Sequence, residues 1–170
     1  AIRMNNLYGT IFKVPEPYIP KIGARIMDLQ SPEDKMSKSS SNELGAIYLN
    51  DPPKEIEKKF KKAVTDSGTE ITYSPEKPGI KNLIDIQSAI SGKTPEEIVL
   101  SYQGKMYGHL KVDTATMVIE ELKPLQEKTQ HYLKDKAELH KILRAGAEKA
   151  AEKAEATLRK VYAAVGFTPC

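Results

Sequence analysis

The chain has 170 residues, enough for one domain with a buried core or for parts of two. With 39% apolar and 29% charged residues, the composition predicts a globular, helix-rich protein, and the formal net charge of +3 is too small to indicate nucleic-acid binding by itself. No apolar run reaches the roughly 18 residues of a membrane span, and no basic leader precedes a cleavage site, so the cytoplasm is the expected location and no membrane partner is expected.

Cysteine and histidine usage gives no sign of a disulfide or a metal site. The single cysteine, Cys170, is the last residue and cannot form an internal disulfide. His109, His131 and His140 have neither partner thiols nor the spacing of metal ligands. We therefore expect no structural metal.

The first 30 residues predict a helix end, a connector and a strand. Residues 1–8 read as the tail of a helix that Gly9 ends, and the three prolines within residues 15–20 exclude a helix there. Residues 24–29 form a short apolar run between Gly23 and the turn-forming Ser31-Pro32, which predicts a strand.

The strongest functional signal is Lys35-Met36-Ser37-Lys38-Ser39, directly after this strand. Two flexible cationic side chains on one loop can follow charge as it moves during phosphoryl or nucleotidyl transfer, and short hydroxyls can bond phosphate or the loop backbone. Two lysines three residues apart are also typical of a solvated surface. The preceding strand favours function, because open α/β sheets bind nucleotides at the carboxyl ends of their strands.

The rest of the sequence predicts helices. Pro52-Pro53 opens a helix with a buried stripe of Ile56, Phe60, Ala63 and Val64, and its lysines are better explained by a solvated face than by RNA contact. Further helices are expected from residue 80 to a cap at Gly92, from a capping box at Thr94, from about residue 110 through Pro124, and over residues 136–165. Residues 78–170 thus predict a four- or five-helix bundle.

Several stretches together carry a resemblance to a known family. Residues 23–29, GARIMDL, followed by KMSKS at residues 35–39, resemble the second signature of the class I aminoacyl-tRNA synthetases, and most closely the bacterial tryptophan-specific group. The resemblance continues through AVTDS at residues 63–67, KPGIKNL at 77–83 and Tyr107-Gly108, and so covers nearly the whole chain. One departure is Ser40-Ser41, where many members have Asp-Pro.

The resemblance implies a fold and a domain division. Residues 1–77 would be an α/β remnant, the end of a Rossmann-type nucleotide-binding domain, and residues 78–170 an all-α anticodon-binding domain. Only one good strand precedes the helices, and neither a Gly-rich phosphate loop nor the family's His-x-x-His motif is present. The chain is therefore expected to be the carboxyl-terminal half of a longer protein, and not competent alone.

The resemblance also implies a reaction. This is ATP-dependent activation of tryptophan to tryptophanyl-adenylate, with ATP accompanied by Mg2+, followed by transfer to tRNA(Trp) in an enzyme that is a homodimer at full length. Lys35 and Lys38 would be catalytic, and Ile26, Lys35, Met36, Ser37, Lys38 and Ser39 would bind the nucleotide. The alternative is a noncatalytic helical module that binds RNA or a protein.

Overall fold

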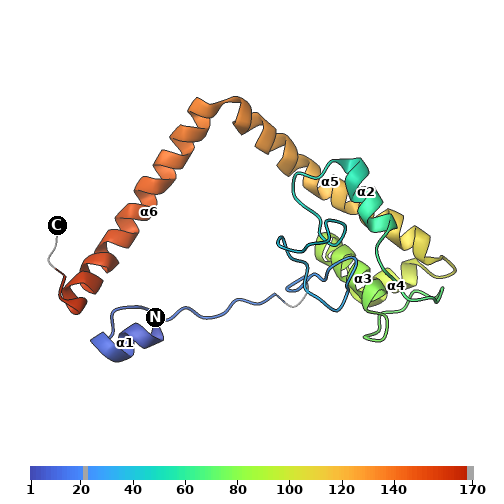
Figure 1. Ribbon diagram of the computed structural model, residues 1–170, viewed down its shortest axis with the longest axis horizontal. Coiled ribbons are helices and arrows are strands. Elements are labelled where there is room, and N and C mark those ends of the chain that lie inside the picture. Colours follow the sequence, from blue (N-terminus) through green and yellow to red (C-terminus); the bar gives the residue numbers. More distant parts are fainter. Residues whose placement is uncertain (21–22, 168–170) are drawn as a thin grey trace. The chain divides into compact units, whose positions relative to one another are not determined.

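The computed structural model describes residues 1–20 and 23–167, and within them it contains six helices (Figure 1). They are α1 (Ile2–Tyr8), α2 (Pro53–Lys61), α3 (Pro78–Ser91), α4 (Pro95–Ser101), α5 (Tyr107–Lys134) and α6 (Lys136–Val165). Each expected helix is present, so the helical character is confirmed. None of the described helices is long and apolar enough to cross a membrane. Cys170 lies outside the described residues.

Local sequence signals set the helix ends. The hydroxyl of Thr94 accepts a hydrogen bond from the Glu97 amide at 3.3 Å, and the Glu97 carboxylate accepts one from the Thr94 amide at 2.8 Å. These two bonds form the predicted capping box of α4. Gly92 ends α3 with φ of 72°, in the left-handed region that glycine adopts without strain. The helix α5 continues through Pro124.

The chain forms two compact units. One combines Ala1–Tyr18 with Gln130–Cys170, and the other is Ile19–Thr129, so that α5 belongs to both. The boundary predicted between residues 77 and 78 lies inside the second unit, and the functional division proposed there stays a prediction.

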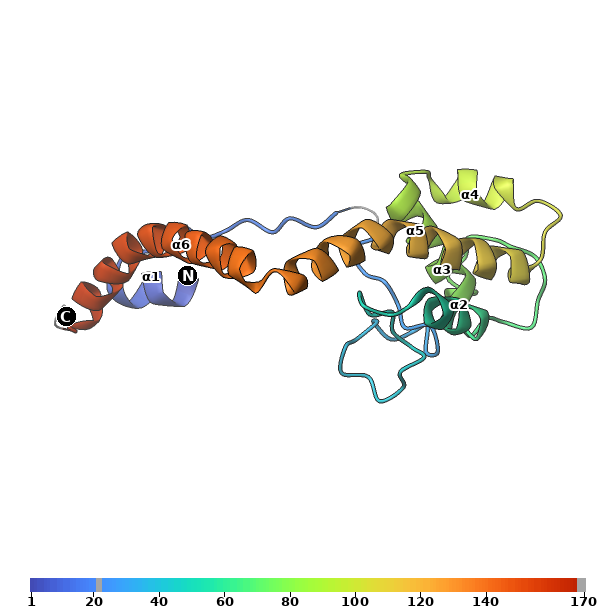
Figure 2. The ribbon, with the colours of Figure 1, turned by 90° about the horizontal axis from the view of Figure 1, so that it is seen from above.

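The core lies in the unit Ile19–Thr129. Most of its fully buried side chains come from α2, α3 and the first half of α5, which appear with α4 in Figure 2, and Leu29 adds one from the segment before α2. They include Phe60, Ile80, Ile84 and Leu110. The Gln87 amide donates to the Thr114 hydroxyl at 2.8 Å and to the Tyr102 hydroxyl at 3.0 Å, so polar groups in this core are paired. In contrast, α1 and α6 contain no buried residue.

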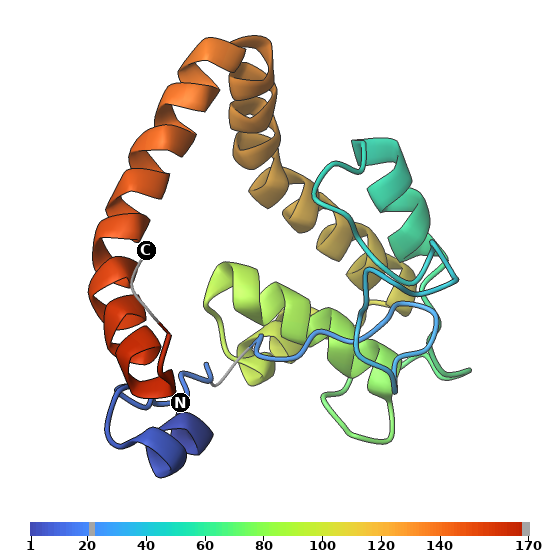
Figure 3. The same cartoon turned by 60° about the vertical axis from the view of Figure 1, so that its left-hand side comes forward.

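The strand predicted over residues 24–29 is wrong. Within the described residues, this part of the chain has a single antiparallel bridge, between Met27 and Lys35, and Figure 3 draws the segment up to α2 without an arrow. The physical reason is the choice of partners. Residues 24, 25 and 29 are bends, and the backbone hydrogen bonds of residues 26–29 go to a tight return of the same chain, to loops and to one side chain instead of to neighbouring strands. The Rossmann-type remnant therefore stays a prediction.

The lysines of α2 are expected to form a solvated face, and this holds for only part of them. Lys59 is 2% exposed, and its amine donates to Asp51 at 2.6 Å and to the Ala46 carbonyl at 2.8 Å. The same amine lies 4.6 Å from the centroid of the Tyr48 ring. A buried charge costs stability unless it is paired, and these three contacts supply the pairing. Lys59 thus fixes the segment that leads into α2.

Candidate functional site

The base of the candidate site is an extended segment and its return. The lysine loop, residues 31–41, leaves the extended residues 26–29 and immediately doubles back alongside them. The Asp28 amide donates to the Asp34 carbonyl at 2.8 Å, and the Met36 amide donates to the Ile26 carbonyl at 3.0 Å. Lys35, between these two bonds, is the bridge partner of Met27. The backbone of Lys35 is therefore held in register at the start of the predicted pentad.

A buried carboxylate shapes the turn between the two segments. Asp28 is 5% exposed and accepts hydrogen bonds from the amides of Gln30 at 2.8 Å and Ser31 at 3.1 Å. Gly45 packs directly against this carboxylate, and a Cβ there would collide with its oxygen atoms. The Leu29 amide donates to the Gly45 carbonyl at 2.8 Å, which ties the far end of the loop to its base. Both ends of the loop are thus anchored in buried structure.

Beyond its base, the lysine loop bonds mainly to itself. Met36 is partly buried and packs against the core, so its side chain anchors this part of the loop. The hydroxyls of Ser37 and Ser39 lie 3.0 Å apart, and the Ser39 amide donates to the Ser37 hydroxyl at 3.3 Å. The Ser40 amide donates to the Ser37 carbonyl at 3.3 Å. These bonds shape the tip but do not attach it to the helices. In Figure 2 the tip projects away from them.

The two predicted catalytic lysines are exposed on this loop. Both Lys35 and Lys38 are exposed, and none of the ion pairs found among the described residues includes either amine. Unpaired ammonium groups keep their full charge available for an anion. A loop with one free cation at its fixed base and a second on its tip can bring positive charge to a phosphate without first breaking an ion pair of its own.

A second cluster joins three of the sequence stretches that carry the resemblance. The Tyr107 hydroxyl donates to the Asp66 carboxylate at 2.9 Å, while the Lys77 amine donates to the Tyr107 oxygen at 3.2 Å. Burial raises the pKa of Asp66, but the hydrogen bonds from Tyr107 and the Gly68 amide outweigh this effect, and its pKa is lowered overall. The hydrogen bond to Tyr107 raises the pKa of Lys77. Tyr107 is 8% exposed, and its hydroxyl connects the segments that carry Asp66 and Lys77. This cluster is therefore a structural joint, a point at which hydrogen bonds hold three segments of the chain together.

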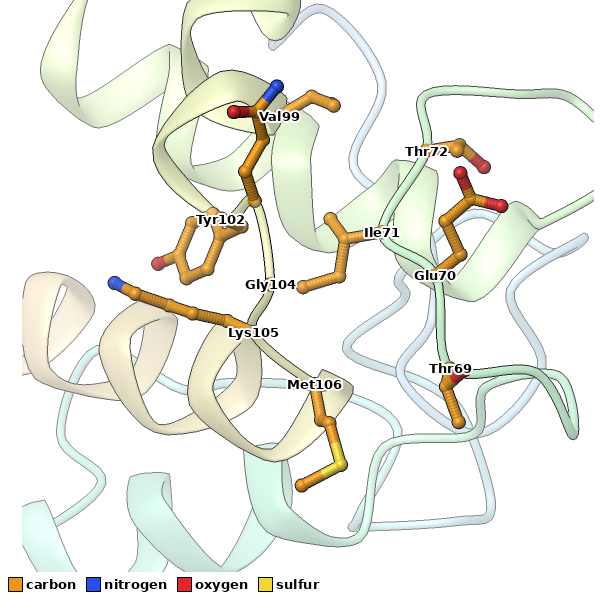
Figure 4. Close-up of a pocket in the computed structure, with 10 residues that line it drawn as sticks. Thr69, Glu70, Ile71, Thr72, Val99, Tyr102, Gly104, Lys105 and Met106 are labelled. Atoms are coloured by element: carbon orange, nitrogen blue, oxygen red, sulfur yellow. The ribbon is translucent and has the colours of Figure 1, made fainter.

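A pocket lies next to this joint, in the same unit. Its volume is about 470 Å3. Figure 4 shows residues 69–72 facing residues 102–106 across it, with Ile71 directed toward Gly104. The polar side chains in its lining are Thr69, Glu70, Thr72, Tyr102, Gln103 and Lys105. The Lys105 amine lies 4.9 Å from the centroid of the Tyr102 ring, and burial raises the pKa of that tyrosine to about 12. The pocket thus combines apolar walls with hydrogen-bonding groups, while the Lys105 amine is directed away from residues 69–72 in Figure 4.

The structure brings the predicted site residues together on one loop and its base. Ile26 lies at the base, and residues 35–39 follow on the return and the tip. Sequence reasoning missed Asp28, Gly45 and Asn82, which hold that base. Asn82 carried a readable signal, because it shares the buried face of α3 with Gly79 and Ile86, at helical spacings of three and four. A polar residue on an apolar face indicates a specific hydrogen-bond partner.

Comparison with known proteins identifies the family. The model of the class I tRNA synthetases for tryptophan and tyrosine (W and Y) matches residues 1–123. The chain belongs to this family. Among its members, it is similar to the tryptophan–tRNA ligases of Clostridium tetani (49% identical), Clostridium perfringens (50%) and Listeria monocytogenes (52%), in each case over 98% of this chain. It spans about half the length of these curated relatives, 49% to 50%.

Solved structures give the same picture. Tryptophanyl-tRNA synthetase from Mycoplasma pneumoniae superimposes with a TM-score of 0.87 at 28% identity, over 98% of this chain and 51% of that one. The enzyme from Campylobacter jejuni complexed with ADP and tryptophan has a TM-score of 0.64, also at 28% identity, and again about half of it is covered.

Proposed function

We propose that this chain is the carboxyl-terminal half of a bacterial tryptophanyl-tRNA synthetase. In that enzyme, ATP activates tryptophan to tryptophanyl-adenylate with release of pyrophosphate, and the tryptophanyl group then passes to tRNA(Trp). Two findings support the proposal. Relatives that are 49% to 50% identical are named tryptophan–tRNA ligases, and the Campylobacter jejuni enzyme was solved with ADP and tryptophan bound. The observation that carries it is the lysine loop, with Lys35 and Lys38 exposed on a fixed base.

The lysine loop would stabilise the negative charge that develops on the departing pyrophosphate. When the tryptophan carboxylate attacks the α-phosphorus of ATP, negative charge moves onto the departing pyrophosphate. Cations that meet this charge most strongly in the transition state raise the rate of the chemical step. Lys35 and Lys38 supply those cations, while the hydroxyls of Ser37 and Ser39 bond phosphate or hold the shape of the tip. Backbone groups at Ile26 would line the adenine.

Magnesium would come with the nucleotide. Among the described residues, no three His, Cys, Asp or Glu side chains are grouped so that they could hold a metal ion. Mg2+ commonly keeps several waters and binds through substrate phosphates, so this part of the protein needs no carboxylate cage. The full-length enzyme would be a cytoplasmic homodimer, and the isolated 170-residue chain would not activate tryptophan.

The test replaces each catalytic lysine in the full-length protein. Lys35→Ala and Lys38→Ala are each expected to lower pyrophosphate exchange roughly 100-fold to 1,000-fold, a loss of about 2.7 to 4 kcal/mol of transition-state stabilisation. Tryptophan affinity, measured by calorimetry, should change little. The matched control is Lys61→Ala, an exposed lysine on α2. Equal losses in the exchange rate and in tryptophan affinity would contradict a cation that acts in the transition state.

The helical part would read tRNA(Trp), and the exposed Lys105 would be one of its contacts to the RNA backbone. If Lys105 contacts a neighbouring phosphate, Lys105→Ala should weaken tRNA binding and reduce the slope of log affinity against log salt by about 1. Filter binding measures both. Pyrophosphate exchange should stay unchanged, and an unaltered salt slope would remove Lys105 from the RNA interface.

A further inference from the structure

The extended segment below the lysine loop has two hydrogen-bonding edges. Along one edge, Ile26 and Asp28 bond to the returning chain at residues 34–36. Along the other edge, Leu29 bonds through its amide to Gly45 and through its carbonyl to the Val64 amide at 2.7 Å. Backbone groups of an extended chain alternate between its two sides, so Met27 also faces this second edge. No backbone partner for Met27 is found there within the described chain.

The side chain of Asn82 takes that place. Its Nδ2 donates to the Met27 carbonyl at 2.8 Å, and its Oδ1 accepts from the Met27 amide at 2.8 Å. One carboxamide thus gives the paired bonds that a residue of a neighbouring strand would give. Asn82 is 2% exposed, and the two bonds compensate for the burial of its amide.

The helix that carries Asn82 is itself fixed against this region. Gly79, one turn earlier on α3, lies so close to the Val64 carbonyl that a Cβ would collide with it. Val64 in turn donates its amide to Leu29. Backbone packing therefore fixes the place from which the Asn82 side chain reaches Met27.

We propose that Asn82 is a positioning residue for the lysine loop. It fixes the Met27 peptide, whose bridge partner on the opposite edge is Lys35, and so sets the point from which the first catalytic lysine projects. This inference rests on the proposed function of the loop. A misplacement of about 1 Å far from the reacting atoms can cost about 100-fold in rate, so the loss of both bonds should be visible in catalysis.

The first experiment compares two buried amides on α3 in the full-length protein. Asn82→Leu removes both bonds to Met27 at similar volume, and it is expected to lower the turnover number of pyrophosphate exchange by about 10-fold to 100-fold with the KM for tryptophan unchanged. Gln87→Leu is the matched control, because Gln87 is also buried, at 4% exposed, on the same helix but bonds to Tyr102 and Thr114. It should lower stability and leave the turnover number unchanged. An equal fall in both variants would overturn the proposal.

A double variant separates positioning from general destabilisation. If Asn82 acts through Lys35, then Asn82→Leu should slow the Lys35→Ala enzyme by less than twofold, although it slows the wild type at least about 10-fold. Independent, multiplying losses would overturn the positioning role. If Lys35→Ala itself leaves the rate unchanged, the proposed function of the loop fails instead. If the leucine variant does not fold, Asn82→Ser repeats the cycle. In that variant of the full-length protein, hydrogen exchange of the Met27 amide should be faster, because the amide has lost its acceptor on Asn82. Unchanged protection of this amide would also overturn the proposal.

Discussion

The helices α3 and α6 share an apolar periodicity but differ in what covers it. Eight residues of α3 are buried, whereas α6 has none. Leu83 on α3 is 1% exposed, while Leu158 on α6 is 42% exposed. Glycine shows the same contrast, because a Cβ on Gly79 would meet the backbone at Val64 and a Cβ on Gly146 would meet nothing. The comparison teaches that spacing of apolar residues predicts a helix, and only its neighbours determine what the helix contributes to stability.

The largest effect on stability is expected on α3, the buried helix of this pair. Leu83→Ala removes a fully buried side chain from the core and leaves a cavity, so the free energy of unfolding should fall by about 2 to 5 kcal/mol. Urea unfolding followed by circular dichroism of the 170-residue chain measures this loss. Leu100→Ala on α4 is the matched control, because Leu100 is 63% exposed. A loss below about 1 kcal/mol at Leu83 would show that α3 is not packed as described.

A smaller effect is expected where the backbone approaches closely. Gly79→Ala forces α3 away from the Val64 carbonyl, and overpacking of this kind typically costs about 1 to 3 kcal/mol. The same substitution at Gly146 has open space around it, and replacing a glycine inside a helix with alanine should stabilise that helix by about 0.5 to 1 kcal/mol. The two variants should therefore shift the thermal midpoint in opposite directions. Shifts of the same sign would contradict the contrast between the two helices.

Much of the helical fold could be predicted from sequence because its signals are local. The capping box at Thr94, the glycine after α3 and the prolines before α2 each act within a few residues. The predicted strand failed because a strand depends on distant partners, and the partners of residues 26–29 are a return loop, two loop carbonyl or amide groups and the side chain of Asn82. Sequence spacing carries no information about which of these will be adjacent.

The candidate site was predictable in part for the same reason. The lysines and serines of residues 35–39 stand next to one another in the sequence, and the structure keeps them exposed on one loop. The residues that hold this tip in place come from elsewhere in the chain. Asn82 is 55 residues from Met27, and Gly45 lies beyond the far end of the loop. Lys59 shows the opposite error, since a lysine on a charged helix face proved to be buried and paired.

The smallest effect is expected at the exposed end of the comparison. Leu158→Ala replaces a side chain that is 42% exposed on a helix without buried residues, and alanine is the better helix former. The free energy of unfolding of the 170-residue chain should therefore change by no more than about 0.5 kcal/mol in either direction. The same urea titration as for Leu83→Ala gives the value. A loss of about 2 kcal/mol or more would mean that Leu158 is covered in solution, because only the removal of buried apolar surface costs that much at a leucine.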